Sequence, residues 1–318
     1  MEERKLIKSG PGSYAVTVPI SWVKKNRLKP GAIIIVQETG FNTVALSAKP
    51  ALQSPERRET SIDASGKSAD AVINLLISAY LNSFSTIILL NPDAPAREKL
   101  LKYLPVMTGL SIVEKTSTRI EIQDLLDMAK VPVRQTARRM DMMIRGLFSD
   151  FGNAAKGPDS SPVNANSLPI LGQSFLVQRI LRIAARQPAV LEQTGIRVEE
   201  IIDILRLVIT LEDIADRIRR SILILQKRGG LPSLKVSVHA LEQHYRTAAE
   251  AYFSVDRDKA TEVMEQKVAI REILAKTLKQ DASVEIYNEL LSLEKLIRGL
   301  ALIANDQWTP SVPARNEK

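Results

Sequence analysis

The sequence predicts a multidomain protein in which a small β-rich unit precedes a small α/β unit and a long all-helical region. Three observations predict this order. Short apolar runs separated by Gly and Pro occupy residues 1–48, helix and strand patterns alternate over residues 60–122, and apolar residues recur at spacings of three and four over residues 123–306. We place the domain boundaries at these changes of period, with residues 307–318 as a C-terminal tail.

The composition is that of a globular protein, since 45% of the 318 residues are hydrophobic and 25% are charged. The absence of cysteine excludes disulfides, thiolate catalysis and cysteine-ligated zinc. The charged start lacks the apolar core of a signal peptide, so we expect a cytoplasmic protein. Residues 71–92 carry no charge, but their Asn, Ser and Thr residues favour a helix, a turn and a strand over a membrane span.

The positive charge is concentrated at the N-terminus. The whole chain has a formal net charge of +8, and residues 1–30 contain seven Lys and Arg against two Glu, a net charge of +5. A cationic excess on one small unit predicts an acidic partner such as nucleic acid.

The N-terminal unit is expected to contain strands around residues 6–7 and 14–18, a short helix over residues 20–25, and a hairpin of residues 33–36 and 43–46. Fewer than 50 residues bury little apolar surface, so this unit is expected to need a partner chain.

Four short motifs carry a family resemblance: Lys8-Ser9-Gly10, residues 13–19, residues 22–25 and Leu28-Lys29-Pro30-Gly31. Residues 3–48 resemble the swapped-hairpin DNA-binding domains of the AbrB, SpoVT and MazE type, in their archaeal form. The resemblance implies a homodimer in which two chains interleave their hairpins into one β fold.

The same resemblance implies DNA contact through Lys8, Lys24 and Lys25, with Arg4 and Lys5 as nearby phosphate contacts. Bacterial members usually place an arginine where this chain has Ser13-Tyr14-Ala15. This departure concerns base-specific readout and leaves contact with the DNA backbone intact. The alternative is that the lysines form an ordinary solvated face, as most charge runs do.

The α/β connector follows a polar, Pro-containing stretch over residues 50–68 that predicts a linker. We expect helices over residues 68–82 and 95–104 and strands over residues 86–90, 111–113 and 119–122. Ser65-Gly66-Lys67-Ser68 resembles only the end of a Walker motif. It lacks the earlier glycine, and no apolar strand is predicted before it, so we expect no phosphate loop.

The C-terminal region is expected to contain six helices in two sets of three, a tandem bundle with a flexible loop at residues 151–169. The expected helices span residues 124–148, 170–186, 198–227, 233–255, 257–279 and 284–306. Pro132 implies a kink or a later start in the first of them.

A weak internal repeat pairs the two sets, because residues 211–216 (LEDIAD) align with residues 293–298 (LEKLIR). Residues 120–306 resemble PhoU, the regulator of phosphate uptake. The resemblance implies that acidic motifs of both halves gather metal, a divalent or ferric ion, with Glu212, Asp216 and Glu294 as candidate ligands here. Arg298 stands in place of the second motif's other acid.

Two alternatives remain for this acidic motif. Oxygen ligands alone would favour a hard ion such as Mg²⁺, although the family resemblance also admits iron or zinc. An ordinary salt-bridge network, with Asp216 paired to Arg219 or Arg220, explains the same residues without metal. His239 and His244 lie five residues apart, which does not suit a shared metal, so we expect structural or surface roles for them.

No nucleophile with an adjacent base, nucleotide loop or carboxylate dyad is recognisable, so we do not expect an enzyme. The two resemblances in this order match archaeal proteins that join a swapped-hairpin domain to a PhoU-like bundle. They imply a dimeric DNA-binding transcriptional regulator of phosphate homeostasis, with the bundle sensing a signal or docking a partner. The alternative is an adaptor that acts on a phosphate transporter or a sensor kinase, in which the basic domain only dimerises.

Overall fold

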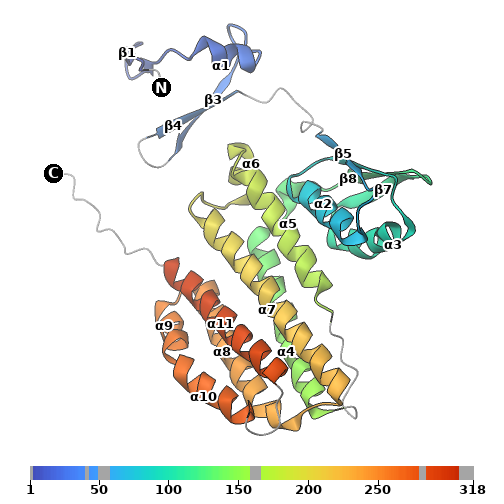
Figure 1. Cartoon of the computed structure of the whole chain (residues 1–318). Helices are drawn as coiled ribbons and strands as arrows, with labels where there is room; N and C mark the ends of the chain where they lie inside the picture. Colours follow the sequence, from blue (N-terminus) through green and yellow to red (C-terminus); the bar gives the residue numbers. More distant parts are fainter. Residues whose placement is uncertain (1–2, 40–42, 49–57, 158–165, 279–283, 308–318) are drawn as a thin grey trace, which may run out of the picture. The chain divides into compact units, whose positions relative to one another are not determined.

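The computed structural model describes residues 3–39, 43–48, 58–157, 166–278 and 284–307. The chain forms two compact units, residues 1–57 and 58–318 (Figure 1). The predicted N-terminal boundary therefore corresponds to a division of the fold. The α/β part and the helical part both belong to the second unit, in which each has a hydrophobic core of its own.

The first unit contains β1 (Ile7–Lys8), β2 (Tyr14–Ala15), α1 (Ile20–Lys25), β3 (Ile34–Thr39) and β4 (Thr43–Ala48). β1 and β2 pair antiparallel, and so do β3 and β4. The turn between β1 and β2 contains Gly10 and Gly12, whose φ angles of 105° and 81° suit glycine. The predicted order of strands, helix and hairpin is confirmed, although β2 is shorter than the predicted strand.

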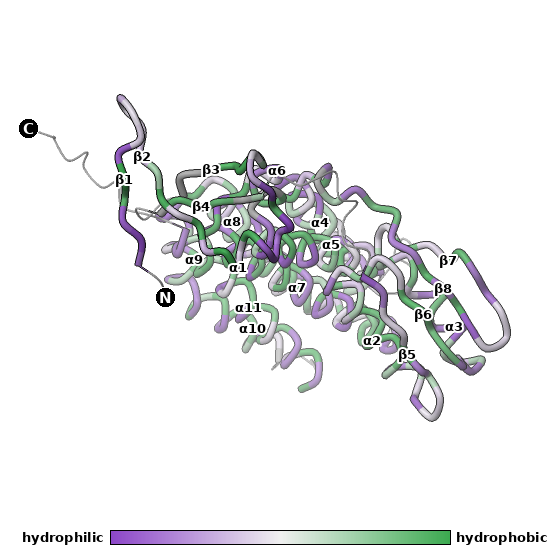
Figure 2. Tube along the Cα trace, turned by 90° about the horizontal axis from the view of Figure 1, so that it is seen from above, coloured by the Kyte–Doolittle hydropathy of each residue, from purple (hydrophilic) through white to green (hydrophobic). Residues whose placement is uncertain are grey.

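The first unit has no buried side chain among those the structure describes. Many of its large apolar side chains are exposed to solvent, and hydrophobic stretches are visible along β3 (Figure 2). The exposed residues are Leu6, Ile7, Tyr14, Val16, Ile20, Ile33, Ile35, Val36 and Val44. A single copy of this unit therefore lacks a hydrophobic core.

The second unit begins with an α/β layer. It contains β5 (Glu59–Asp63), α2 (Ala69–Leu81), β6 (Thr86–Leu90), α3 (Ala94–Tyr103), the 3-10 helix η1 (Leu104–Val106), β7 (Leu110–Lys115) and β8 (Arg119–Asp124). The sheet order is β5-β6-β8-β7, with β5 parallel to β6 and the other pairs antiparallel. Ser68 caps α2 by accepting a hydrogen bond from the Ala71 N–H (3.2 Å).

Strand β5 bears on two expectations. The predicted linker over residues 50–68 is wrong for residues 59–63, which form this strand, whereas residues 50–57 lie outside the described residues. A strand does lead into Ser65-Gly66-Lys67-Ser68, but its sequence, ETSID, is mostly polar and is not the apolar strand of a phosphate loop. The Lys67 ammonium donates to the Asp63 carbonyl (2.8 Å), so this lysine is held by its own loop.

The helical part follows the 3-10 helix η2 (Met128–Lys130). It contains α4 (Val133–Lys156), α5 (Leu168–Ala184), α6 (Pro188–Thr194), α7 (Glu200–Arg228), η3 (Pro232–Leu234), α8 (Lys235–Ser254), α9 (Arg257–Glu265), α10 (Lys267–Leu278) and α11 (Val284–Asp306). Not one of the helices among the described residues is both long and apolar enough to cross a bilayer.

Several helix boundaries differ from the predictions. The first helix begins after Pro132, as one of its two alternatives anticipated, and continues to Lys156 through part of the predicted loop at residues 151–169. The predicted helix over residues 257–279 is two helices, α9 and α10, and α6 was not predicted. Residues 158–165 of the predicted loop and 308–318 of the predicted tail lie outside the described residues.

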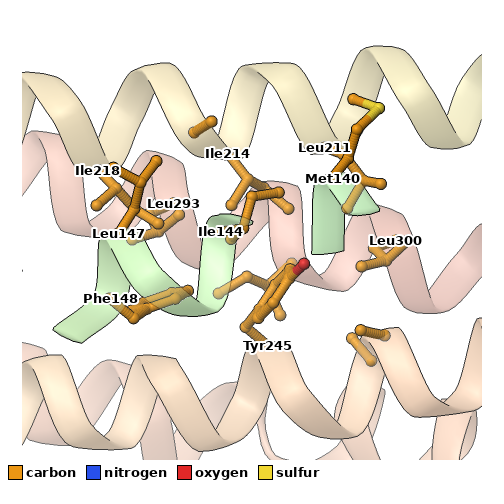
Figure 3. Close-up of a cluster of buried hydrophobic side chains, with 14 of the residues drawn as sticks. Met140, Ile144, Leu147, Phe148, Leu211, Ile214, Ile218, Tyr245, Leu293 and Leu300 are labelled. Atoms are coloured by element: carbon orange, nitrogen blue, oxygen red, sulfur yellow. The ribbon is translucent and has the colours of Figure 1, made fainter. Parts of the chain in front are cut away.

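The core of the helical part lies between α4, α7, α8 and α11. Side chains from these four helices point toward one another (Figure 3). They include Met140, Ile144, Leu147, Phe148, Leu211, Ile214, Ile218, Tyr245, Leu293 and Leu300. α5 packs on α4 and α7, whereas α9 and α10 pack on α8 and α11. The first set of helices therefore contributes α4 and α7 to the centre and α5 to an outer layer. The second set contributes α8 and α11 to the centre and α9 and α10 to an outer layer.

A buried arginine joins the α/β layer to the helical part. Arg179 of α5 is fully buried and forms an ion pair with Asp124 at the end of β8. Its guanidinium also lies 4.5 Å from the ring centroid of Tyr80 on α2. The α5 backbone approaches η1 closely, because a Cβ added at Gly172 would lie 3.0 Å from the Val106 carbonyl oxygen. These contacts explain why residues 58–318 form one unit.

Candidate nucleic-acid interface and acidic motifs

The five predicted DNA-binding residues are all exposed and lie in the first unit. Lys8 is on β1 opposite Tyr14, and Lys24 and Lys25 form the last turn of α1. Arg4 and Lys5 lie in the segment before β1. The structure therefore places all five in solvent, on three segments of one small unit.

The lysines are available for an external anion. Within the part of the chain that the structure describes, Lys8, Lys24 and Lys25 have no carboxylate partner. Positive charge in the last turn of α1 is also favourable, because the C-terminal end of a helix carries partial negative charge. The Asn26 side-chain amide donates to the Trp22 carbonyl (2.8 Å) and helps to end the helix at this point.

Two further cations were counted in the charge of this unit but were not predicted to contact DNA. Arg27 and Lys29 follow α1 directly and are exposed. Arg27 adopts a positive φ of 52°, at the point where the chain leaves α1. The sequence signal that could have identified them is their proximity to Lys24 and Lys25.

Glu212 on α7 is a partly buried carboxylate without a hydrogen-bond or ion-pair partner among the described residues. Burial, together with the nearby charges of Asp213 and Asp216, raises the pKa of Glu212 to about 7. This side chain is therefore the least satisfied acid of the predicted motif.

Asp216, one turn further along α7, is neutralised by arginines. Arg219 and Arg220 both lie 2.7 Å from its carboxylate oxygens. This is the salt-bridge alternative predicted from the sequence. The two acids of the motif therefore differ, since one has two cationic partners and the other has none.

Glu294 occupies the equivalent repeat position in α11 and is completely buried. It forms ion pairs with Arg298, one turn away, and with Arg271 of α10 (3.3 Å). The structure does not bring Glu212, Asp216 and Glu294 together, and the described residues contain no group of three or more acidic or His side chains suited to a metal. The donor set does not fit a metal centre, so we derive no metal chemistry from it.

The two histidines lie apart in environment as well as in sequence. His239 is exposed, whereas His244 is buried on α8, with its Nδ1 3.1 Å from the Gln266 side-chain oxygen. Burial lowers the pKa of His244, which favours its neutral form. The predicted surface and structural roles agree with these positions.

Comparison with protein-family models, with curated proteins and with solved structures finds no match to this chain. The functional argument therefore depends on the exposed cations and the missing core of the first unit.

Proposed function

We propose that the chain is a homodimeric DNA-binding regulator that contacts the DNA backbone through its first unit. The observation that carries the proposal is that this unit exposes both its apolar and its cationic side chains. Apolar exposure calls for a partner copy. Lys8, Lys24 and Lys25, which have no carboxylate partner among the described residues, call for an external anion.

The dimer argument is energetic. Ordering a residue costs about 1–2 kcal/mol of backbone entropy, and a small unit offsets this cost mainly by burying apolar surface. The described part of the first unit buries no side chain, and Ile7, Val36 and Val44 are each more than half exposed. A second copy that covers these residues would supply the missing core.

The DNA argument is electrostatic. Two copies of Lys8, Lys24 and Lys25 would present six ammonium groups. If all six neutralised phosphates, the logarithm of the binding constant would fall with the logarithm of salt concentration at a slope of about −5. A binding mode that does not depend on phosphates would show little salt dependence.

The experiment is a fluorescence-anisotropy titration with a duplex from the promoter of the chain's own gene, at several salt concentrations. The Lys24→Ala/Lys25→Ala variant should bind more weakly and with a shallower salt slope. Its matched control is Lys227→Ala/Arg228→Ala, an exposed cation pair in the last turn of α7. Unchanged binding by the first variant, or equal losses in both, would remove the support for this interface.

The phosphate part of the proposal rests on the resemblance of the helical region to PhoU. We propose that the helical part senses a signal or docks a partner of phosphate homeostasis. In the alternative adaptor, the same first unit only dimerises, and the titration would detect no specific DNA binding while the dimer persists.

A further inference from the structure

A cavity of about 550 Å³ opens at one end of the helical part. It lies where α4 and α7 begin and where α8 and α11 end, and all its walls belong to the second unit. Pockets of this volume hold small organic molecules. The walls combine apolar and aromatic side chains with charged ones, so the charges decide which molecule would fit.

Two pairs of lining charges neutralise each other. Arg134 of α4 lies 2.6 Å from Glu200 of α7, and Arg197 lies 3.1 Å from Glu199. These four residues therefore leave no net charge for a ligand. Three other charged residues line the same cavity, namely Arg138, Asp203 and Asp306.

Arg138 has an aromatic contact but no carboxylate partner among the described residues. Its guanidinium lies 4.6 Å from the ring centroid of Phe253, and it donates one long hydrogen bond (3.4 Å) to the Phe253 carbonyl. A guanidinium has five N–H donors in a fixed plane, so most of them remain available. A carboxylate is one of the groups that such a planar set of donors binds through two parallel hydrogen bonds.

Asp203 and Asp306 share a single cation. Arg206 lies 2.6 Å from Asp306 but 4.0 Å from Asp203. Burial raises the pKa of Asp203, and the nearby charges of Asp306 and Glu200 act in the same direction, against the opposing effect of Arg206. This side of the cavity therefore lacks one positive charge.

Gln307 provides a second, independent indication of a missing donor. Its side-chain oxygen is buried and has no hydrogen-bond partner among the described residues. Its side chain also hydrogen-bonds Tyr252, a residue of the same wall. An ammonium group, with three N–H donors, could satisfy Gln307 and the two aspartates together.

The helix arrangement puts the positive and negative sites within one cavity. Since Arg134 contacts Glu200, the next turns of α4 and α7 carry Arg138 and Asp203 at similar depth. The same cavity has apolar and aromatic lining residues, among which Leu207 and Tyr252 are buried. The matching ligand carries a carboxylate, an ammonium group and an apolar body.

We propose that this cavity binds a free α-amino acid with a large apolar side chain, whose carboxylate pairs with Arg138 and whose ammonium group pairs with Asp203 and Asp306. The zwitterion adds no net charge to the cavity, and its side chain covers the apolar wall. This inference concerns the second unit alone, so the result of the DNA-binding experiment neither supports nor refutes it.

The test is isothermal titration calorimetry of the full chain with L-phenylalanine and with L-leucine. At least one should bind, whereas L-phenylalaninamide, without a carboxylate, and 3-phenylpropanoate, without an ammonium group, should bind about tenfold more weakly or worse. Arg138→Gln and Asp203→Asn should each weaken the amino acid by a similar factor. Arg139→Gln, an exposed neighbour on α4, and Asp258→Asn, exposed on α9, are the matched controls.

Three results would overturn the proposal: no binding of either amino acid at millimolar concentration, analogues that bind as tightly as the amino acid, or unchanged affinity in both cavity variants. Far-UV circular dichroism checks that each variant is folded. Should Arg138→Gln fail to fold, Arg138→Lys keeps the charge but loses the planar donor pair, and a weaker affinity is expected for it as well.

Discussion

Replacement of Glu212 by Gln should stabilise the protein at alkaline pH. Burial raises the pKa of Glu212 from 4.5 to about 7, so the folded chain holds this group in its charged form less readily than the unfolded chain does. The cost of the charged carboxylate to stability is absent below about pH 4.5, grows between pH 4.5 and about 7, and is complete above about pH 7. The neutral amide removes this cost.

The magnitude follows from the shift. At about 1.4 kcal/mol per pH unit, the change in pKa would correspond to about 3 kcal/mol for a fully buried group. Glu212 is only partly buried, and solvent screens its charge, so the expected gain is about 1–2 kcal/mol at pH 8.5 and much smaller at pH 5.

The assay is urea unfolding followed by circular dichroism, with the mutant and the wild type compared at pH 5 and pH 8.5. Glu285→Gln, at an exposed acid on α11, is the control and should give a difference that does not change with pH. A Glu212→Gln protein that is less stable than the wild type at pH 8.5 would mean that the carboxylate has a favourable partner, and the reasoning would be wrong.

Three more outcomes are expected. Glu294→Gln should lower the free energy of unfolding by about 3 kcal/mol at pH 7.5 in the same urea assay, because the Arg298 guanidinium loses its carboxylate partner in a buried site. A loss below about 1 kcal/mol would contradict this. Gly230→Ala should destabilise the folded protein by about 2–3 kcal/mol, because the new Cβ would lie 2.4 Å from the Gly157 Cα and the residue has a φ of 95°. Gly229→Ala meets no such contact, so an equal loss of stability in that variant would contradict the steric argument. Val36→Asp should convert a dimer to monomers in light scattering, and a wild-type monomer would refute the dimer.

Local sequence signals predicted much of the fold. Ser68 before α2, Pro132 before α4 and Gly229 after α7 mark the helix ends that the structure has. These signals succeed because each depends on the backbone of one or two residues.

The missed elements depend on distant contacts. Strand β5 (ETSID) contains a single hydrophobic residue, Ile62, lies at a sheet edge, and pairs with β6, which is more than 20 residues away. Helix α4 continues through Gly152 because Phe151 and Ala155 are buried in the core, a contribution that local propensity does not include.

The candidate sites show the same division. The cationic first unit was evident from its charge, whereas the cavity joins residues as distant in sequence as Arg138 and Gln307. The repeat predicts that Glu212 and Glu294 are equivalent. It does not predict that Arg271 of α10 pairs with Glu294 and not with Glu212.

The buried Arg179 has a mechanical consequence. Two nitrogens of its guanidinium, Nε and Nη1, are buried without hydrogen-bond partners among the described residues, so separating Arg179 from Asp124 would leave a buried charge uncompensated. The α/β layer and α5 are therefore expected to move together. Since α5 packs on α7, a movement of α5 would be felt by the helix that carries Glu212.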